Sequence, residues 1–158
     1  MKHQHVKIAV IDAAPSGVEN VPARALGENK WELIRSPLYA IKVASGDVVQ
    51  ILNDETGAFN IVSRGGNVCV HFYLGKENAD DYEFTTDVAK EITEEIDAFG
   101  GSMDGVKAGL IVFTLPIGMG FSEIESVFAG ALERYQGAEW QYSNVYDTVT
   151  GEPLNWWR

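Results

Sequence analysis

The chain has 158 residues, 46% of them hydrophobic and 22% charged, which is the composition of an ordinary globular protein. Its length suits one compact domain or two small subdomains that share a core. No apolar run approaches the roughly 20 residues that cross a bilayer, and the N-terminus lacks the apolar stretch of a signal peptide, so we expect a cytoplasmic protein that binds no membrane. The net charge of −11 argues against nucleic acid as a partner.

Cys69 is the only cysteine in the sequence, so the chain forms no internal disulfide and no multi-cysteine zinc site. The acidic run Asp80-Asp81-Tyr82-Glu83 does not match the D-x-D-x-D-G pattern whose alternating oxygens surround calcium. We therefore expect neither a metal nor a cofactor.

Residues 1–66 contain short strand-like segments that are joined by turns. Residues 6–11 form an apolar run, and residues 30–36 alternate between larger and more polar side chains. Residues 47–52 and 58–63 flank a loop that is rich in turn-forming residues. Short strands with tight turns favour a small antiparallel β-barrel-like half.

The pattern changes after Gly65-Gly66. Residues 68–74 are almost continuously apolar and predict a central strand. A helix is expected from an N-cap at Thr86 to about Phe99, because Val88, Ile92 and Ile96 recur on one helical face. Two strands follow, over residues 102–107 and 109–115.

The last third of the chain predicts a helix and a final strand. Ser122 and Glu125 have the S-x-x-E spacing of a capping box, and Gly137 ends the helix that follows. Residues 140–146 alternate as a strand. The order strand, helix, strand, strand, helix, strand is that of a ferredoxin-like βαββαβ half. We therefore predict an α+β protein with a β-barrel-like subdomain at 1–66 and a ferredoxin-like subdomain with a C-terminal tail at 67–158.

The acidic residues are concentrated in one part of the chain. Residues 77–121 contain two basic and ten acidic residues. Such a cluster creates a field of one sign that attracts cationic partners. It is also compatible with a solvated helix face that only keeps the protein soluble, or with a metal site.

Three short motifs resemble a known family. Ser36-Pro37-Leu38-Tyr39, Ser45-Gly46-Asp47-Val48-Val49 and Ser63-Arg64-Gly65-Gly66-Asn67 are similar in sequence and spacing to the bacterial domain of unknown function 4265 family. The likeness runs from about Glu19 to Tyr146. It implies a bacterial, two-part α+β protein, and it brings no catalytic residues with it.

Three further features are candidates for chemistry or binding. Cys69 and His71 lie two apart on a strand and share a face, but no third catalytic group is evident, so a packed thiol and a satisfied histidine are the simpler interpretation. Residues 116–122 lie between a strand and a helix and lack the residues of a phosphate loop. Trp156 and Trp157 either pack back on the protein or anchor a partner.

These observations predict a non-catalytic acidic protein-binding module. The most concrete form is an immunity protein or antitoxin that neutralises a basic, nuclease-like toxin domain. The alternatives are a small-molecule sensor with its ligand near Gly118 to Ser122 and a hydrolase built on Cys69 and His71. The expected partner-binding residues are Glu77, Asp80, Asp81, Glu83, Asp87, Glu91, Glu94, Glu95, Asp97, Trp156 and Trp157. Asp104 is a candidate extension of the same acidic surface.

Overall fold

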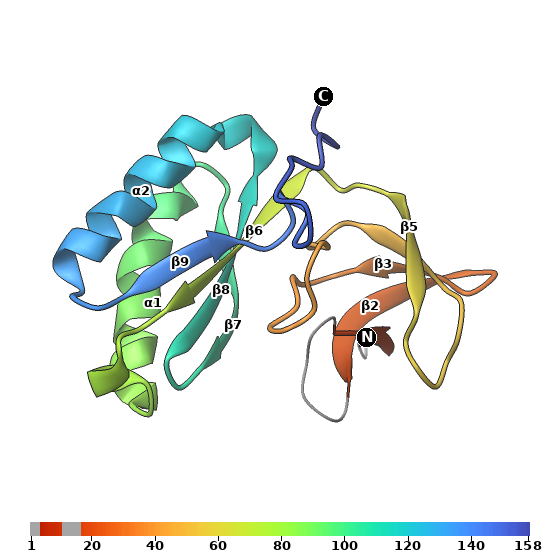
Figure 1. The fold of residues 1–158 in the computed structure, drawn as a ribbon, viewed down its shortest axis with the longest axis horizontal. Helices are drawn as coiled ribbons and strands as arrows, with labels where there is room; N and C mark the ends of the chain where they lie inside the picture. The colour runs from red at the N-terminus through yellow and green to blue at the C-terminus, as the bar shows by residue number, and fades with distance from the viewer. Residues whose placement is uncertain (1–3, 11–16) are drawn as a thin grey trace.

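The fold consists of two antiparallel sheets and two helices, which agrees with the expected α+β class (Figure 1). The computed structural model describes residues 4–10 and 17–158. The two sheets lie side by side, and both helices cover the face of the second sheet that is turned away from the first (Figure 1). The C-terminal tail returns to the region between the two sheets (Figure 1).

The first sheet has five strands in the order β1-β2-β3-β4-β5, and each neighbouring pair is antiparallel. Its tightest turn joins the second and third strands, where Glu28 and Asn29 both have positive φ, as a two-residue hairpin turn requires. The strands are β1 (Gln4–Ala9), β2 (Val18–Gly27), β3 (Lys30–Leu33), β4 (Val48–Ile51) and β5 (Phe59–Ser63). Ile11, the last residue of the first expected strand, lies outside the described residues.

The expected β-barrel-like half is an open sheet. Closure of a barrel requires the first and last strands to pair, and in the described part of the chain β1 and β5 do not. The turn before β5 reaches β1 at one point, where the backbone N–H of Ala9 donates to the carbonyl oxygen of Gly57 at 2.9 Å. A turn supplies too few backbone groups for a ladder, so the two edges stay separate.

The second sheet has four strands in the order β7-β8-β6-β9, again with antiparallel neighbours. All the helices and strands predicted after Gly66 are present in the predicted chain order. They are β6 (Asn67–Tyr73), α1 (Tyr82–Asp97), β7 (Ser102–Lys107), β8 (Leu110–Pro116), α2 (Phe121–Arg134) and β9 (Glu139–Tyr142), with short 3-10 turns η1 (Lys76–Asn78) and η2 (Ile117–Met119).

Both helix starts differ from the prediction. The N-cap of α1 is Asp81, whose carboxylate accepts the backbone N–H of Phe84 at 2.9 Å. Thr86 lies inside the helix, where its hydroxyl donates to the carbonyl oxygen of Tyr82. No side chain caps α2, and Glu125 of the expected capping box instead accepts the hydroxyl of Tyr142 at 2.8 Å. Tertiary contacts and an earlier acidic cap therefore override the local motifs.

The main core lies between the second sheet and its helices. Alternate residues of β6 and β8 point to this side and meet the apolar stripes of α1 and α2, as the periodicities of strand and helix require. Phe72, Phe113 and Phe128 are fully buried there. No helix in the described ranges 4–10 and 17–158 is long and apolar enough to cross a membrane.

The opposite face of the second sheet packs on the first half of the chain. Cys69, His71 and Thr114 point to this side, and the segment between β3 and β4 lies over them. The imidazole Nε2 of His71 lies 3.1 Å from the carbonyl oxygen of Pro37. The two halves therefore share a polar junction, and the division at residues 66 and 67 remains a prediction.

Candidate functional site

The outward face of α1 carries a stripe of carboxylates. Val88, Ile92 and Ile96 are buried against the sheet. Since a helix turns about 100° per residue, Glu83, Asp87 and the acids near the C-terminal end fall on the opposite side. The exposed acidic residues here and in the preceding turn are Glu77, Asp80, Asp81, Glu83, Asp87, Glu91, Glu94, Glu95 and Asp97.

Three of these nine carboxylates have partners within the protein. Asp81 caps the helix, Glu91 accepts a hydrogen bond from the hydroxyl of Tyr135, and Glu95 forms an ion pair with Arg134 at 3.0 Å. In the described part of the chain no ion pair involves the remaining six, which are Glu77, Asp80, Glu83, Asp87, Glu94 and Asp97. Most of the predicted acidic surface is therefore available to a partner.

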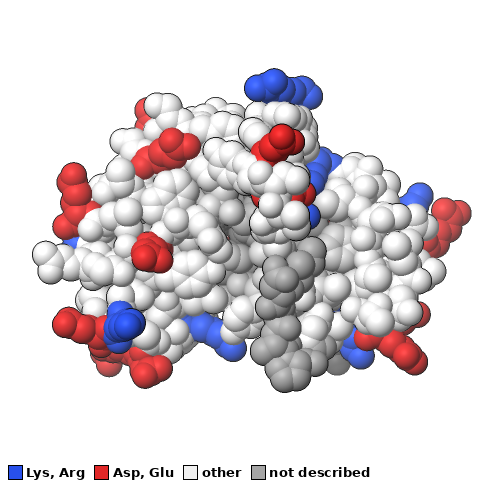
Figure 2. Space-filling model, in the orientation of Figure 1, with Lys and Arg blue, Asp and Glu red and all other residues white. Residues whose placement is uncertain are grey.

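The charge distribution can be followed on the molecular surface. Acidic side chains gather over the region where η1 and the start of α1 lie, with a basic group beside them (Figure 2). Lys90 is the only basic residue of α1. Because carboxylates outnumber basic groups here, the face presents a net negative field to an approaching protein.

The two terminal tryptophans pack back on the second half of the chain. The ring of Trp157 stacks edge-on against Phe121 with centroids 5.2 Å apart, and the indole N–H of Trp156 donates to the carbonyl oxygen of Asn144 at 2.7 Å. The guanidinium of Arg64 lies 5.5 Å from the centroid of Trp156. Both side chains stay half-buried. The C-terminal end of the chain lies apart from α1 (Figure 1).

Cys69 and His71 share a face of β6, as their spacing predicts, but their surroundings oppose nucleophilic chemistry. Cys69 is fully buried, and burial raises the pKa of its thiol to about 12. Burial also lowers the pKa of His71, which is 2% exposed. A buried thiol with a raised pKa is a poor nucleophile.

The loop from Gly118 to Ser122 forms the end of η2 and the first turn of α2. Gly120 has φ of 86°, which allows the chain to turn from η2 into the helix. This position explains the glycines without a ligand. The described residues also contain no cluster of three or more histidine, cysteine, aspartate or glutamate side chains that could hold a metal ion.

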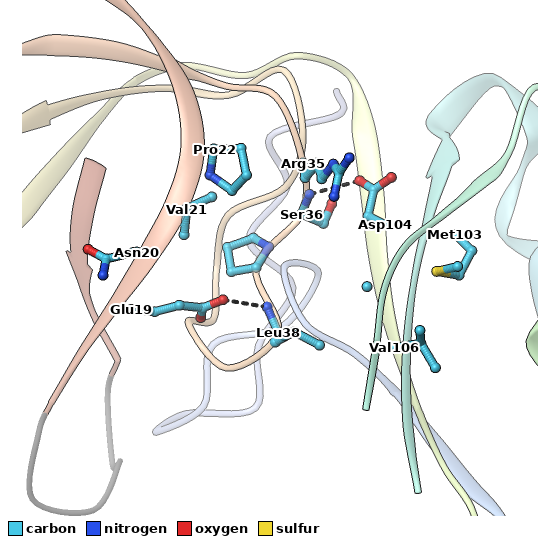
Figure 3. Close-up of a pocket in the computed structure, with 12 residues that line it drawn as sticks. Glu19, Asn20, Val21, Pro22, Arg35, Ser36, Leu38, Met103, Asp104 and Val106 are labelled. Carbon is cyan, nitrogen blue, oxygen red and sulfur yellow. Dashed lines mark hydrogen bonds between the residues drawn. The ribbon is translucent and has the colours of Figure 1, made fainter. Parts of the chain in front are cut away.

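A cavity of about 660 Å³ lies between the two sheets (Figure 3). One wall is β2, which carries Glu19 and Pro22; the opposite wall is β7, which carries Met103 and Asp104 (Figure 3). Residues 35–38 line the cavity between these two strands. This volume is in the range of small-molecule pockets, and the sequence interpretation did not anticipate it.

A chain of hydrogen bonds crosses the junction beside this cavity. The backbone N–H of Ser45 donates to Ser36 Oγ at 2.9 Å, and Ser36 Oγ lies 2.6 Å from Thr114 Oγ1. The Thr114 hydroxyl donates to Asp104 Oδ2 at 2.6 Å, so the Ser36 hydroxyl must donate to Thr114. The backbone N–H of Ser36 reaches the same Asp104 oxygen at 2.8 Å.

Two other carboxylates hold the loops of the junction. Glu19 accepts the backbone N–H groups of Leu38, Tyr39 and Ala40, all within 2.9 Å. Asp47 is fully buried, accepts the N–H groups of Ala44 and Gly65 and pairs with Arg64 at 3.1 Å. These acids are therefore structural, because backbone donors occupy their oxygens.

The three motifs that carried the family resemblance meet at this junction. Ser36, Ser45 and Asp47 belong to the bonds described above, and Asn67 donates its side-chain N–H to the carbonyl oxygen of Ser45 at 2.8 Å. The backbones of Gly46 and Gly65 are so close that a Cβ at Gly65 would lie 2.4 Å from the carbonyl carbon of Gly46. The motifs thus encode the contact between the two halves.

Comparisons with known proteins identify a family and a fold for this chain. The family model described as "Domain of unknown function (DUF4265)" matches residues 19–140. A structure titled "Novel crystal structure of a hypothetical protein from Neisseria gonorrhoeae" matches with a TM-score of 0.66 and 12% identity, over 90% of this chain and 95% of that one. At this identity the likeness concerns the fold alone. The comparison with curated proteins gave no match.

Proposed function

Because the chain belongs to the DUF4265 family of domains of unknown function, its role has to come from its own surface, and we propose that it is a non-catalytic module that binds a basic protein. The most specific form of the proposal is an immunity protein or antitoxin that neutralises a nuclease-like toxin domain. The observation that supports it is the outward face of α1, on which carboxylates lie exposed and largely without internal partners.

The physical mechanism is electrostatic. A nuclease that binds phosphates needs a positive cleft, and a surface of the opposite sign both speeds the encounter and occupies that cleft. Exposed charges of this kind act mainly on the association rate and are screened by salt, with a Debye length of roughly 10 Å at 0.1 M. The proposal therefore implies an association rate that falls steeply with ionic strength.

The first experiment is co-expression with the product of a neighbouring gene, followed by size-exclusion chromatography. Co-elution of the two chains supports the proposal. If no neighbouring product co-elutes at low salt, the immunity proposal is wrong.

The second experiment neutralises the surface. The triple variant Glu83→Gln, Asp87→Asn, Glu94→Gln removes three exposed charges that have no ion pair in the described structure, and it should slow association at least tenfold at low salt. The matched control Glu133→Gln, Glu139→Gln, Glu152→Gln changes the net charge equally at exposed positions outside α1. If the two triple variants slowed association equally, net charge alone would explain the effect, and a specific role of the α1 face would be refuted.

We also propose that the second half is a ferredoxin-like sandwich. The support is the strand order β7-β8-β6-β9, in which the central β8 is antiparallel to both β6 and β7 and both helices lie on one face. This is the arrangement expected of a split β-α-β repeat.

The alternative function is a small-molecule sensor, and the cavity between the sheets favours it. Arg35 offers a cation at this cavity, whereas Oδ2 of Asp104 on β7 is already held by Ser36 and Thr114 (Figure 3). A thermal-shift screen with nucleotides and amino acids separates the two functions, because only a sensor is stabilised by a small ligand. Arg35→Gln should abolish any shift that arises in this cavity.

A further inference from the structure

β7 is an edge strand of the second sheet. It pairs with β8 on one side, and no strand of the described residues pairs with it on the other. In an antiparallel sheet, alternate N–H and C=O groups of an edge strand point away from the neighbouring strand. Among the described residues, no backbone group of residues 102–107 makes a hydrogen bond outside the ladder with β8. Within the part of the chain that the structure describes, this edge therefore offers a row of donors and acceptors without partners.

Two cavities flank the same edge. On the face toward the first half lies the 660 Å³ cavity of Figure 3, which includes Asp104 and Gly105 of β7. On the other face lies a cavity of about 510 Å³ between α1 and β7, which includes Ala89, Thr93 and Met103. Side chains of a strand alternate between the two faces of a sheet. A strand laid along β7 would send its side chains alternately into these two spaces.

A β-bulge between Met103 and Gly105 interrupts the ladder with β8. Bulges often protect sheet edges from unwanted pairing, and they also redirect single side chains. Here the extra residue is Asp104, whose carboxylate is turned into the junction and bound by Ser36 and Thr114. The bulge thus serves the internal contact, and Gly105, Val106 and Lys107 continue in regular register.

We propose that the β7 edge accepts an extended, lysine- or arginine-bearing segment of the protein partner as a fifth strand of this sheet. This inference rests on the proposed function, since it specifies how the basic partner is bound. Backbone hydrogen bonds would supply binding that depends little on sequence, and the two cavities would select alternate side chains.

The charged residues that line the two cavities indicate which kind of segment would bind along β7. Glu94 and Asp97 line the cavity beside α1, and Lys90 offsets only one of them. The cavity between the sheets carries Glu19 and Asp104 against Arg35. Both spaces therefore have a negative balance and suit side chains with an apolar stem and a cationic end. A second copy of this chain fits poorly, because it brings another net charge of −11.

The test uses two peptides of alternating lysine and valine, each as long as β7. One is unmodified, and in the other every backbone amide is N-methylated so that neither edge of the strand can donate a hydrogen bond. Both carry the same charge, so simple attraction binds them equally, whereas strand addition requires the amides. We expect methylation to weaken binding at least tenfold, because several backbone hydrogen bonds are lost. The variant Glu94→Gln, Asp97→Asn should weaken the unmodified peptide, and Glu139→Gln should not.

Amide hydrogen exchange locates the added strand. We expect the unmodified peptide to protect amides of Ser102–Lys107 and not those of β9, the opposite edge of the same sheet. Equal binding of both peptides, protection at β9 instead, no binding, or a dimer of this chain through β7 would each overturn the inference. If a basic partner co-elutes but does not protect the β7 amides from hydrogen exchange, the proposed function is supported and the proposed strand addition is wrong. If no partner co-elutes, the proposed function falls regardless of the peptides.

Discussion

The hydroxyl of Thr114 should hold the two halves of the protein together. Thr114 is 6% exposed, accepts a hydrogen bond from Ser36 and donates one to Asp104, each at 2.6 Å. Thr114→Val keeps the shape of the side chain and removes both bonds. A neutral bond contributes about 0.5–1.5 kcal/mol and a bond to a charged group about 1.5–3 kcal/mol, so the free energy of unfolding should fall by about 2–4.5 kcal/mol.

Urea unfolding followed by tryptophan fluorescence measures this loss, with the slope of the transition as a check that the unfolded state has not changed. Thr93→Val is the matched control, because the hydroxyl of Thr93 bonds only the carbonyl oxygen of Ala89 in its own helix. That bond adds little to helix stability, so we expect a loss of less than about 1 kcal/mol. Equal losses in the two variants would refute the assigned role of the junction.

Three further predictions concern buried groups. Burial lowers the pKa of His71 from 6.5, so the unfolded chain binds a proton there more readily than the folded one. The free energy of unfolding should therefore be full above about pH 6.5 and decline as the pH falls below it. His71→Gln should flatten this decline in urea titrations between about pH 5 and 7. The Cys69 thiol should react with a thiol reagent only as fast as the protein unfolds, and rapid labelling of native protein at pH 8 would contradict its burial. Gly65→Ala should lower the free energy of unfolding by more than about 2 kcal/mol, because the added Cβ meets the Gly46 backbone. Gly118→Ala, with open space around it, should change the free energy of unfolding by less than about 0.5 kcal/mol. Similar values for both variants would be inconsistent with the close contact.

The order of elements after Gly66 could be predicted because periodicity reports burial directly. The apolar runs of β6 and β8 are buried on both faces, under the helices on one side and under the first half on the other. The acidic face of α1 follows from the same periodicity. Helix starts were less predictable, since Asp81 and Thr86 both satisfy the local rule for a cap and only the folded chain distinguishes them.

The junction between the halves could not be predicted from spacing. Ser36, Thr114 and Asp104 come from three distant segments, and no local pattern relates them. The openness of the first sheet could not be predicted either, because barrel closure depends on whether β1 pairs with β5 and not on how clearly the sequence predicts either strand. The motifs around Ser36, Asp47 and Arg64 marked the correct residues, but their meaning as a contact emerged only in three dimensions.

Asn144 connects the order of synthesis to the completion of the fold. Its side-chain oxygen accepts the backbone N–H of Cys69 and its amide donates to the carbonyl oxygen of Asn67, while its own carbonyl receives the indole of Trp156. On a ribosome, all five strands of the first sheet are therefore synthesised long before the start of β6 gains its last bonds. A nascent chain of this protein carries an unfinished central strand until Asn144, 75 residues after Cys69, has been synthesised, and Trp156 then covers the site that Asn144 has completed.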